Sequence, residues 1–195
     1  MSMTETQLEA VLEARDAYVS DLAHGNRRER QRAAHGLNLL AQEDVTVVAE
    51  VAEELVAALE HTEAQTQWEC LNALAEIAVR DPHLVEDAFP VAEELLFEDG
   101  SVVTRMAAFR FVARYGAHGH QESERSWPLL SEAVQCYHGD SEYRNMLQGL
   151  LDFAHGSISD EVRASLVKRM SFDAKNGRGF IRTYSAEIVA AAKED

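Results

Sequence analysis

The stretch AFRFVARYG at residues 108–116 sets the pattern for the whole chain. Four other nine-residue stretches align with it without gaps: AAHGLNLLA at 33–41, CLNALAEIA at 70–78, MLQGLLDFA at 146–154 and YSAEIVAAA at 184–192. Their starting positions are almost evenly spaced along the chain. Self-similarity at a fixed period of this length indicates a stacked helical array.

The positions within each stretch explain why it forms a helix that packs. The first, second, fifth, eighth and ninth positions are mostly apolar or small, which draws one stripe along a helix of 3.6 residues per turn. The ninth position is always small, so a neighbouring helix can approach closely: Ala41, Ala78, Gly116, Ala154 and Ala192. The fifth position is always aliphatic: Leu37, Leu74, Val112, Leu150 and Ile188. We therefore expect Leu74 and Leu150 to lie in the core.

Proline and cap residues divide the rest of each repeat. Phe89-Pro90 and Trp127-Pro128 occupy the same position in successive repeats. Proline is tolerated in the first turn of a helix, so second helices are predicted to begin there. The expected helix pairs are 27–42/45–61, 64–80/83–98, 101–116/127–138 and 140–155/159–171. The residues just before the second helices of the middle repeats, 82–88 and 120–126, are each expected to form a short helical turn or a loop.

Residues 99–108 resemble a HEAT repeat, through Asp99, Val103, Arg105, Ala107 and Ala108. Arg30 with Ala33 and Ala34 is a weaker match, and Gln67 and Tyr143 replace the arginine, so an incomplete ladder of acid–arginine pairs is expected. The resemblance to HEAT or armadillo-like proteins implies a curved stack of antiparallel helix pairs, with the second helices on the concave face. It implies no particular activity.

These observations predict one all-α domain over residues 1–195. We expect a right-handed α-α superhelix of four to five repeats and about ten helices. An N-terminal capping helix at 4–24, with Leu8, Val11 and Leu12 as its apolar residues, precedes the repeats. The expected boundaries of the repeats and of the last helix are 26–61, 62–99, 100–139, 140–177 and 178–193.

Charge is distributed unevenly along this chain of net charge −16. Residues 43–99 contain 16 acidic residues and one base, Arg80, whereas 163–182 are locally basic. The acidic part disfavours binding to nucleic acid or to an anionic membrane, because phosphate is neutralised by clustered Lys and Arg. No segment has the roughly 20 apolar residues of a membrane span, and the N-terminus lacks the features of a signal peptide. Cys70 and Cys136 lie in apolar patterns and are expected to be buried and reduced, as in the cytoplasm.

The main candidate site is a set of glutamates on the expected second helices. They are Glu53, Glu54, Glu93, Glu94 and Glu132. On the concave face they would form an acidic groove for a Lys/Arg-rich segment of a protein or peptide partner, because complementary charge selects the partner's sign. The alternative is that these carboxylates serve solubility or a halophilic source.

A second candidate is the basic C-terminal region. Arg169, Arg178 and Arg182 would bind an anion, which suggests a nucleic-acid- or nucleotide-linked role similar to that of HEAT-type DNA-repair proteins. Arginines one turn apart, such as Arg110 and Arg114, either clamp a carboxylate or phosphate or bridge to acids on adjacent repeats.

One group of side chains in the sequence could bind a metal ion. His118 and His120, in the longest expected loop, with Cys136 and His138, have side chains that suit zinc, but their spacing fits no known pattern. The sequence contains no Gly-x-Ser-x-Gly and no His-Glu-x-x-His. We therefore expect a non-enzymatic binding scaffold without a cofactor or metal, either a monomer or a weak homodimer. An enzyme of unrecognised type is the remaining alternative.

Overall fold

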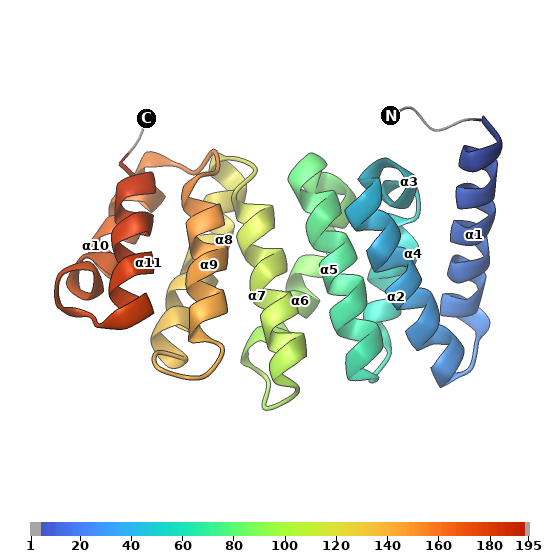
Figure 1. Cartoon of the computed structure of the whole chain (residues 1–195), viewed down its shortest axis with the longest axis horizontal. Coiled ribbons are helices and arrows are strands. Elements are labelled where there is room, and N and C mark those ends of the chain that lie inside the picture. Colours follow the sequence, from blue (N-terminus) through green and yellow to red (C-terminus); the bar gives the residue numbers. More distant parts are fainter. Residues whose placement is uncertain (1–4, 194–195) are drawn as a thin grey trace.

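The computed structural model describes residues 5–193 and shows helices stacked side by side in two rows (Figure 1). The row nearer the viewer, called the front row, contains α2 (Arg27–Glu43), α5 (Ala64–Arg80), α7 (Val102–Gly116), α9 (Tyr143–Ala154) and α11 (Gly179–Ala191). The back row contains α3 (Val45–Ala49), α4 (Ala52–Ala57), the 3-10 helices η1 (Ala58–Glu60) and η2 (Pro82–Ala88), α6 (Phe89–Phe97), α8 (His120–Cys136) and α10 (Asp160–Asn176).

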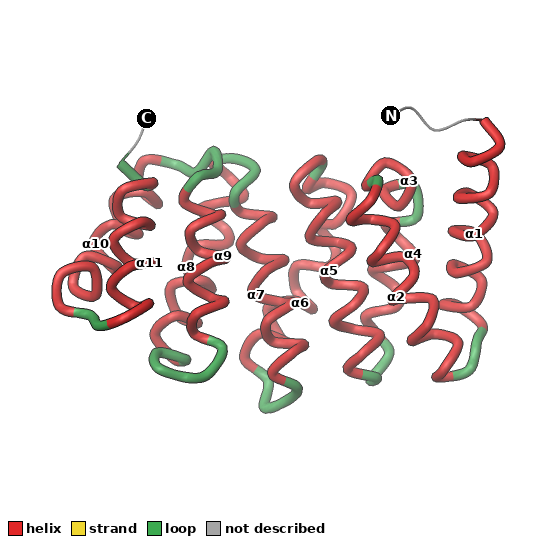
Figure 2. The backbone as a smooth tube through the Cα atoms, in the orientation of Figure 1, coloured by secondary structure: helices red, strands yellow, loops and turns green. Residues whose placement is uncertain are grey.

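Helix α1 (Glu5–His24) lies at the N-terminal end of the stack (Figure 1). Short loops join consecutive helices, and between residues 5 and 193 the chain contains eleven α-helices and no strand (Figure 2). The all-α expectation is confirmed. No helix in this range is long and apolar enough to cross a membrane.

The five repeated stretches form the front row. The aliphatic column is fully buried, each member having 0% of its surface exposed: Leu37, Leu74, Val112, Leu150 and Ile188. The small column is also buried, and Gly116 shows why. A Cβ atom on Gly116 would lie 2.6 Å from Ser126 Cβ and 2.7 Å from the Phe153 ring. The absence of a side chain therefore lets α8 and α9 pack directly on the end of α7.

The back row is less regular than the front row. The expected helix at 45–61 is broken into α3, α4 and η1, whereas η2 and α6 meet at Phe89-Pro90 as predicted. The prediction for Trp127-Pro128 was wrong, because α8 begins at His120 and contains Pro128. Proline removes the hydrogen bond to the carbonyl four residues earlier, here that of Glu124. Both residues are exposed, so water can satisfy that carbonyl.

Side chains N-terminal to Pro128 hold the first turns of α8 in place. Ser123 and Ser126 are fully buried, Trp127 is 8% exposed, and Trp127 donates a hydrogen bond from Nε1 to Ser165 Oγ at 2.8 Å. Because of this tertiary packing, α8 begins earlier in the chain than the position of Pro128 predicts. At the other end of α8, Cys136 is exposed, contrary to the prediction, while Cys70 is buried as predicted.

Helix α1 packs on α2 through its C-terminal half. Leu22 is 2% exposed, and Tyr18 lies against Gly36, where a Cβ atom would come within 2.5 Å of the tyrosine ring. Leu8, one of the residues expected to cap the array, is 40% exposed. At the opposite end Phe172 on α10 is 72% exposed. Helix α1 therefore covers its end of the stack through Tyr18 and Leu22 and not through Leu8.

Two ion pairs join successive repeats near the N-terminal ends of the front-row helices. Arg105 Nη1 donates to Glu142 Oε1 at 2.8 Å, and Arg30 Nη2 donates to Glu63 Oε1. The arginines are 12% and 20% exposed at their side chains, and the glutamates 6% and 12%. At the intervening junction the Gln67 side chain donates to the carbonyl oxygen of Leu59, and within residues 5–193 it bonds no acid. The ladder is incomplete as expected, although the acid bound by Arg105 is not Asp99.

Candidate functional site

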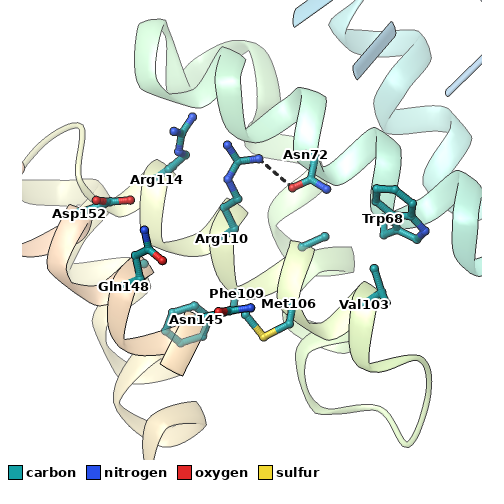
Figure 3. A pocket seen from close by; sticks show the side chains of 12 residues that line it. Trp68, Asn72, Val103, Met106, Phe109, Arg110, Arg114, Asn145, Gln148 and Asp152 are labelled. Carbon is teal, nitrogen blue, oxygen red and sulfur yellow. Dashed lines mark hydrogen bonds between the residues drawn. The ribbon is translucent and has the colours of Figure 1, made fainter. Parts of the chain in front are cut away.

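A hollow of about 490 Å³ lies on the front row, over α7 and between α5 and α9 (Figure 3). We call it the front groove. Its floor is low because Ala107 carries only a methyl group and Gly149 carries no side chain, which leaves the buried Phe109 ring beneath. The lining residues are Trp68, Asn72, Val103, Met106, Ala107, Phe109, Arg110, Arg114, Asn145, Gln148, Gly149 and Asp152.

The end of the groove nearest the start of α5 and α7 is apolar. Trp68 and Met106 are half-buried, and Val103 is 52% exposed. All three line the groove (Figure 3). An indole, a thioether and an exposed aliphatic side chain form a surface that would gain about 25 cal/mol for each Å² of apolar area covered. This end is suited to an apolar side chain.

Two arginines on α7 line the groove beyond its apolar end. Arg110 donates to Asn72 Oδ1 at 2.8 Å (dashed in Figure 3) and to Glu76 Oε1 at 2.6 Å. Arg114 donates to the other oxygen, Glu76 Oε2. One carboxylate therefore serves two guanidinium groups, and the cluster of three side chains has an excess of positive charge.

The α9 wall of the groove presents polar side chains that have no partner. Asn145, Gln148 and Asp152 are exposed, and none forms a hydrogen bond or ion pair through its side chain within residues 5–193. A carboxamide offers two N–H donors and one carbonyl acceptor. Asn145 and Gln148 can therefore pair with the N–H and C=O groups of an extended backbone.

A second hollow of about 450 Å³ adjoins the front groove near the C-terminal ends of α7 and α9. Arg114 and Asp152 line both hollows, and His118 and His155 line the second. The hollowed surface of the front row therefore continues beyond Arg114, past the ends of these helices.

Solved structures with a similar arrangement of helices include designed proteins. A designed armadillo repeat protein in complex with the peptide (KR)4 matches with a TM-score of 0.76 at 15% identity, over 98% of this chain and 88% of that one. A computationally designed armadillo repeat protein for modular peptide recognition matches with 0.69 at 14% identity, over 96% and 94%. The fold is a HEAT/armadillo-like α-solenoid.

A further structural match is an engineered protein, and the two sequence comparisons give no match. An engineered protein from the Northeast Structural Genomics Consortium matches with a TM-score of 0.72 at 18% identity, over 98% of this chain and 92% of that one. No protein-family model matches the sequence, and no curated protein matches it. At these identities the structural likeness shows the fold alone.

The five glutamates singled out from the sequence lie on the back row of the solenoid, on α4, α6 and α8. All are exposed, and their side chains form no hydrogen bond or ion pair within the described residues. Glu53 lines a hollow with Glu86 and Asp87 beside η2, whereas Glu54 lines another with Leu22 of α1. The two neighbours thus point to different hollows.

The three arginines of the basic region differ in their contacts. Arg169 donates from Nη2 to Ser131 Oγ at 2.9 Å and to Gln135 Oε1 at 3.1 Å, which joins α10 to α8. Arg178, which precedes α11, and Arg182, within α11, are exposed and pair with no other described side chain. Arg169 is therefore committed to packing between helices, and two free arginines are left for an anion.

The histidine and cysteine candidates do not come together. His120 lies in α8 rather than in a loop, His118 Nδ1 lies 3.2 Å from the carbonyl oxygen of Val79, and His138 lies 3.2 Å from Asp173. Within residues 5–193 no three His, Cys, Asp or Glu side chains are grouped as metal ligands would be.

Burial raises the pKa of several groups away from the groove, two of them strongly. Burial raises the pKa of the Cys70 thiol above its usual range, so this cysteine is unreactive. Burial also raises the pKa of Tyr143 to about 12. Both side chains serve the core.

Sequence reasoning missed most of the front groove. Of the two alternatives for Arg110 and Arg114, the structure shows the bridge to an acid on the adjacent repeat, Glu76. Asn72, Arg110 and Gln148 occupy one column of the repeat, on three successive front-row helices. A polar column beside the apolar stripe is the signal that would have located the groove, but only the packed helices show that it borders a hollow.

Proposed function

We propose that this α-solenoid is a non-enzymatic scaffold that binds an extended segment of another protein in the front groove. The observation that carries the proposal is the composition of that hollow. It combines an apolar end, an arginine pair and unpaired carboxamides on three successive front-row helices. The apolar end and the arginines can contact side chains of an extended segment, and the carboxamides can pair with its backbone.

The dimensions of the groove support an extended occupant. Its α7 residues run from Val103 to Arg114, about 17 Å along a helix that rises 1.5 Å per residue. An extended chain advances about 3.3 Å per residue, so about five residues would span the groove. The designed armadillo repeat protein bound to (KR)4 is an example of a similar fold with a peptide ligand.

The chemistry of the lining favours binding over catalysis. The twelve residues that line the groove in the described chain include no Ser, Thr, Cys, Lys or His. Asp152 is the single unpaired ionised group among them. Nucleophilic catalysis uses a nucleophile that is activated by an adjacent base, and no second residue of this lining could serve as a base beside Asp152.

The acidic back row is a separate proposed surface. Glu53, Glu54, Glu93, Glu94 and Glu132 are free to meet Lys or Arg side chains of a basic partner. Their contribution would be mainly to association rate and to the choice of partner charge. This surface and the front groove lie on different rows, so one chain would have two places for partners.

A peptide-display experiment tests the groove. Random seven-residue peptides would be selected on the full chain, and the enriched ones measured by fluorescence anisotropy. Trp68→Ala and the double variant Asn145→Ala/Gln148→Ala should weaken binding about tenfold or more, while Glu132→Gln on the back row serves as the matched control. Enriched peptides whose affinity is the same for all three variants would overturn the proposed groove.

A further inference from the structure

We infer that the segment bound in the front groove carries an acidic side chain, held by Arg110 and Arg114, and an apolar side chain a few residues away, held by Trp68 and Met106. This inference rests on the proposed function and adds the chemical class of the partner. It follows from the arrangement of charge in the groove and from the distance between its two ends.

The arginine pair has bonding capacity left for a second carboxylate. A guanidinium group has five N–H donors, of which Arg110 uses two and Arg114 one within the described chain. Their side chains are 36% and 26% exposed, so the remaining donors are accessible yet partly shielded from water. Carboxylates form short, charge-assisted hydrogen bonds with such donors.

A basic side chain at the same place would compete with the two arginines for its acceptors. Each oxygen of Glu76 already accepts from one arginine, and Asn72 Oδ1 accepts from Arg110. A lysine would approach two guanidinium groups of its own sign. Among the described residues that line the groove, Asp152 alone would attract the lysine, and it lies on α9, across the groove from the arginines of α7.

The spacing of the two ends sets the spacing expected in the ligand. Met106 and Arg110 are one helical turn apart, about 6 Å, which is about two residues of extended chain. Met106 and Arg114 are two turns apart, about 12 Å, which is about four residues by the same measure. The acidic residue should therefore lie two to four residues from the apolar one, with the backbone between them beside Asn145 and Gln148.

The opposite charges of Arg114 and Asp152 provide a matched pair of variants. Replacement of Arg114 by Gln removes attraction for an acid, whereas replacement of Asp152 by Asn removes attraction for a base. The Asp152 side chain has no partner within residues 5–193, so D152N should leave the fold unchanged. Circular dichroism of each variant checks that the helices are intact.

The experiment uses labelled seven-residue peptides in a Gly/Ser background, with Phe followed two, three or four positions later by Glu, Gln or Lys. Anisotropy titrations on the full chain at physiological salt should show the best Glu peptide binding about tenfold more tightly than its Gln counterpart, as expected for a charge-assisted hydrogen bond. R114Q should remove most of that advantage, D152N should keep it, and R114E should transfer the preference to Lys.

Two results would overturn the inference in distinguishable ways. In one, Lys peptides bind best and D152N weakens their binding. In another form of the same result, Glu, Gln and Lys peptides bind equally and all lose affinity in W68A. Either outcome means that the groove binds peptides but does not recognise an acidic side chain. If no peptide responds to W68A, R114Q or D152N, the groove itself is not a binding site, and the proposed function fails as well.

Discussion

The two rows of the solenoid are built from the same repeat but use their polar residues differently. Front-row helices run unbroken for 12 to 17 residues, and several of their polar side chains bridge to the next helix. Glu69 is 1% exposed and accepts from Asn38 at 2.6 Å, with His35 Nδ1 at 2.8 Å. In the back row α3, α4 and α6 have 5, 6 and 9 residues, and its five candidate glutamates point to solvent.

This difference shows how one scaffold separates structure from recognition. In the front row the small and aliphatic columns bring successive helices close, so polar groups between them become shared and partly buried. The hollow over α7 occurs where Ala107 and Gly149 leave space that the neighbouring polar groups do not fill. Within residues 5–193 the five candidate glutamates of the back row have no such neighbours. Their substitution should therefore affect partners rather than folding.

The largest expected effect tests the packing of the front row. Leu74 is fully buried, and Leu74→Ala should lower the free energy of unfolding by about 2–5 kcal/mol because it leaves a cavity. Leu84 on η2 is the matched control, since its side chain is 44% exposed. The Leu84→Ala variant should lose at most about 0.5 kcal/mol. Urea denaturation followed by circular dichroism measures both, and similar values for the two variants would contradict the assignment of the core.

The next effect concerns the ion pairs between repeats. The guanidinium of Arg105 is largely buried against Glu142. Glu142→Ala should destabilise the fold by roughly 1–3 kcal/mol, since it leaves that charge without its partner. The side chains of Arg125 and Glu86 form a more exposed pair, at 37% and 54%. Glu86→Ala should therefore cost at most about 1 kcal/mol, and equal losses would show that burial does not distinguish these pairs.

Lowering the pH should weaken the same junctions between repeats. The hydrogen bond from Arg30 lowers the pKa of Glu63, and the hydrogen bonds from Ser141 and Arg105 lower the pKa of Glu142. A carboxyl group whose pKa is lowered by folding stabilises the native state above its unfolded pKa of about 4.3. That stability is lost as the pH falls through the lower folded pKa.

The double variant Glu63→Gln/Glu142→Gln isolates this contribution. Between pH 5 and pH 3 its urea midpoint should fall less than that of the unaltered chain, because two carboxylates that must otherwise be protonated are gone. Glu53→Gln/Glu93→Gln, on the back row, is the control and should leave the pH dependence nearly as it was. If the control variant reduces the pH dependence of the urea midpoint as much as the test variant does, the junction pairs are not the source of that dependence.

The smallest effect on stability, with a larger one on binding, is expected for the back row. Glu53, Glu54, Glu93 and Glu94 have exposed and unpaired side chains. Changing all four to Gln should alter the free energy of unfolding by at most about 0.5 kcal/mol per site. Binding of a basic partner should weaken and lose salt dependence. Unchanged binding to such a partner, measured at two salt concentrations, would remove the acidic surface from consideration.

The sequence predicted the front-row helices to within a few residues, because each has a strict apolar stripe. The expected helix at 64–80 is the observed α5, and α7 begins one residue after the predicted start at 101. It predicted the start of α8 wrongly, since local proline chemistry does not reveal that Ser123 and Ser126 are buried. Cys136 also fitted an apolar pattern and is exposed, because α8 ends there and no neighbouring helix covers it.

The repeat period, the small column and the aliphatic column were determined by the sequence itself, since side-chain volume and spacing along a helix are local properties. The tertiary structure decided which polar residues face each other. Glu76 meets Arg110 and Arg114 across 34 and 38 residues, and Gly149 lies over Phe109. The position of the front groove follows from how α5, α7 and α9 pack, because a hollow is a property of the space between helices and not of any one of them.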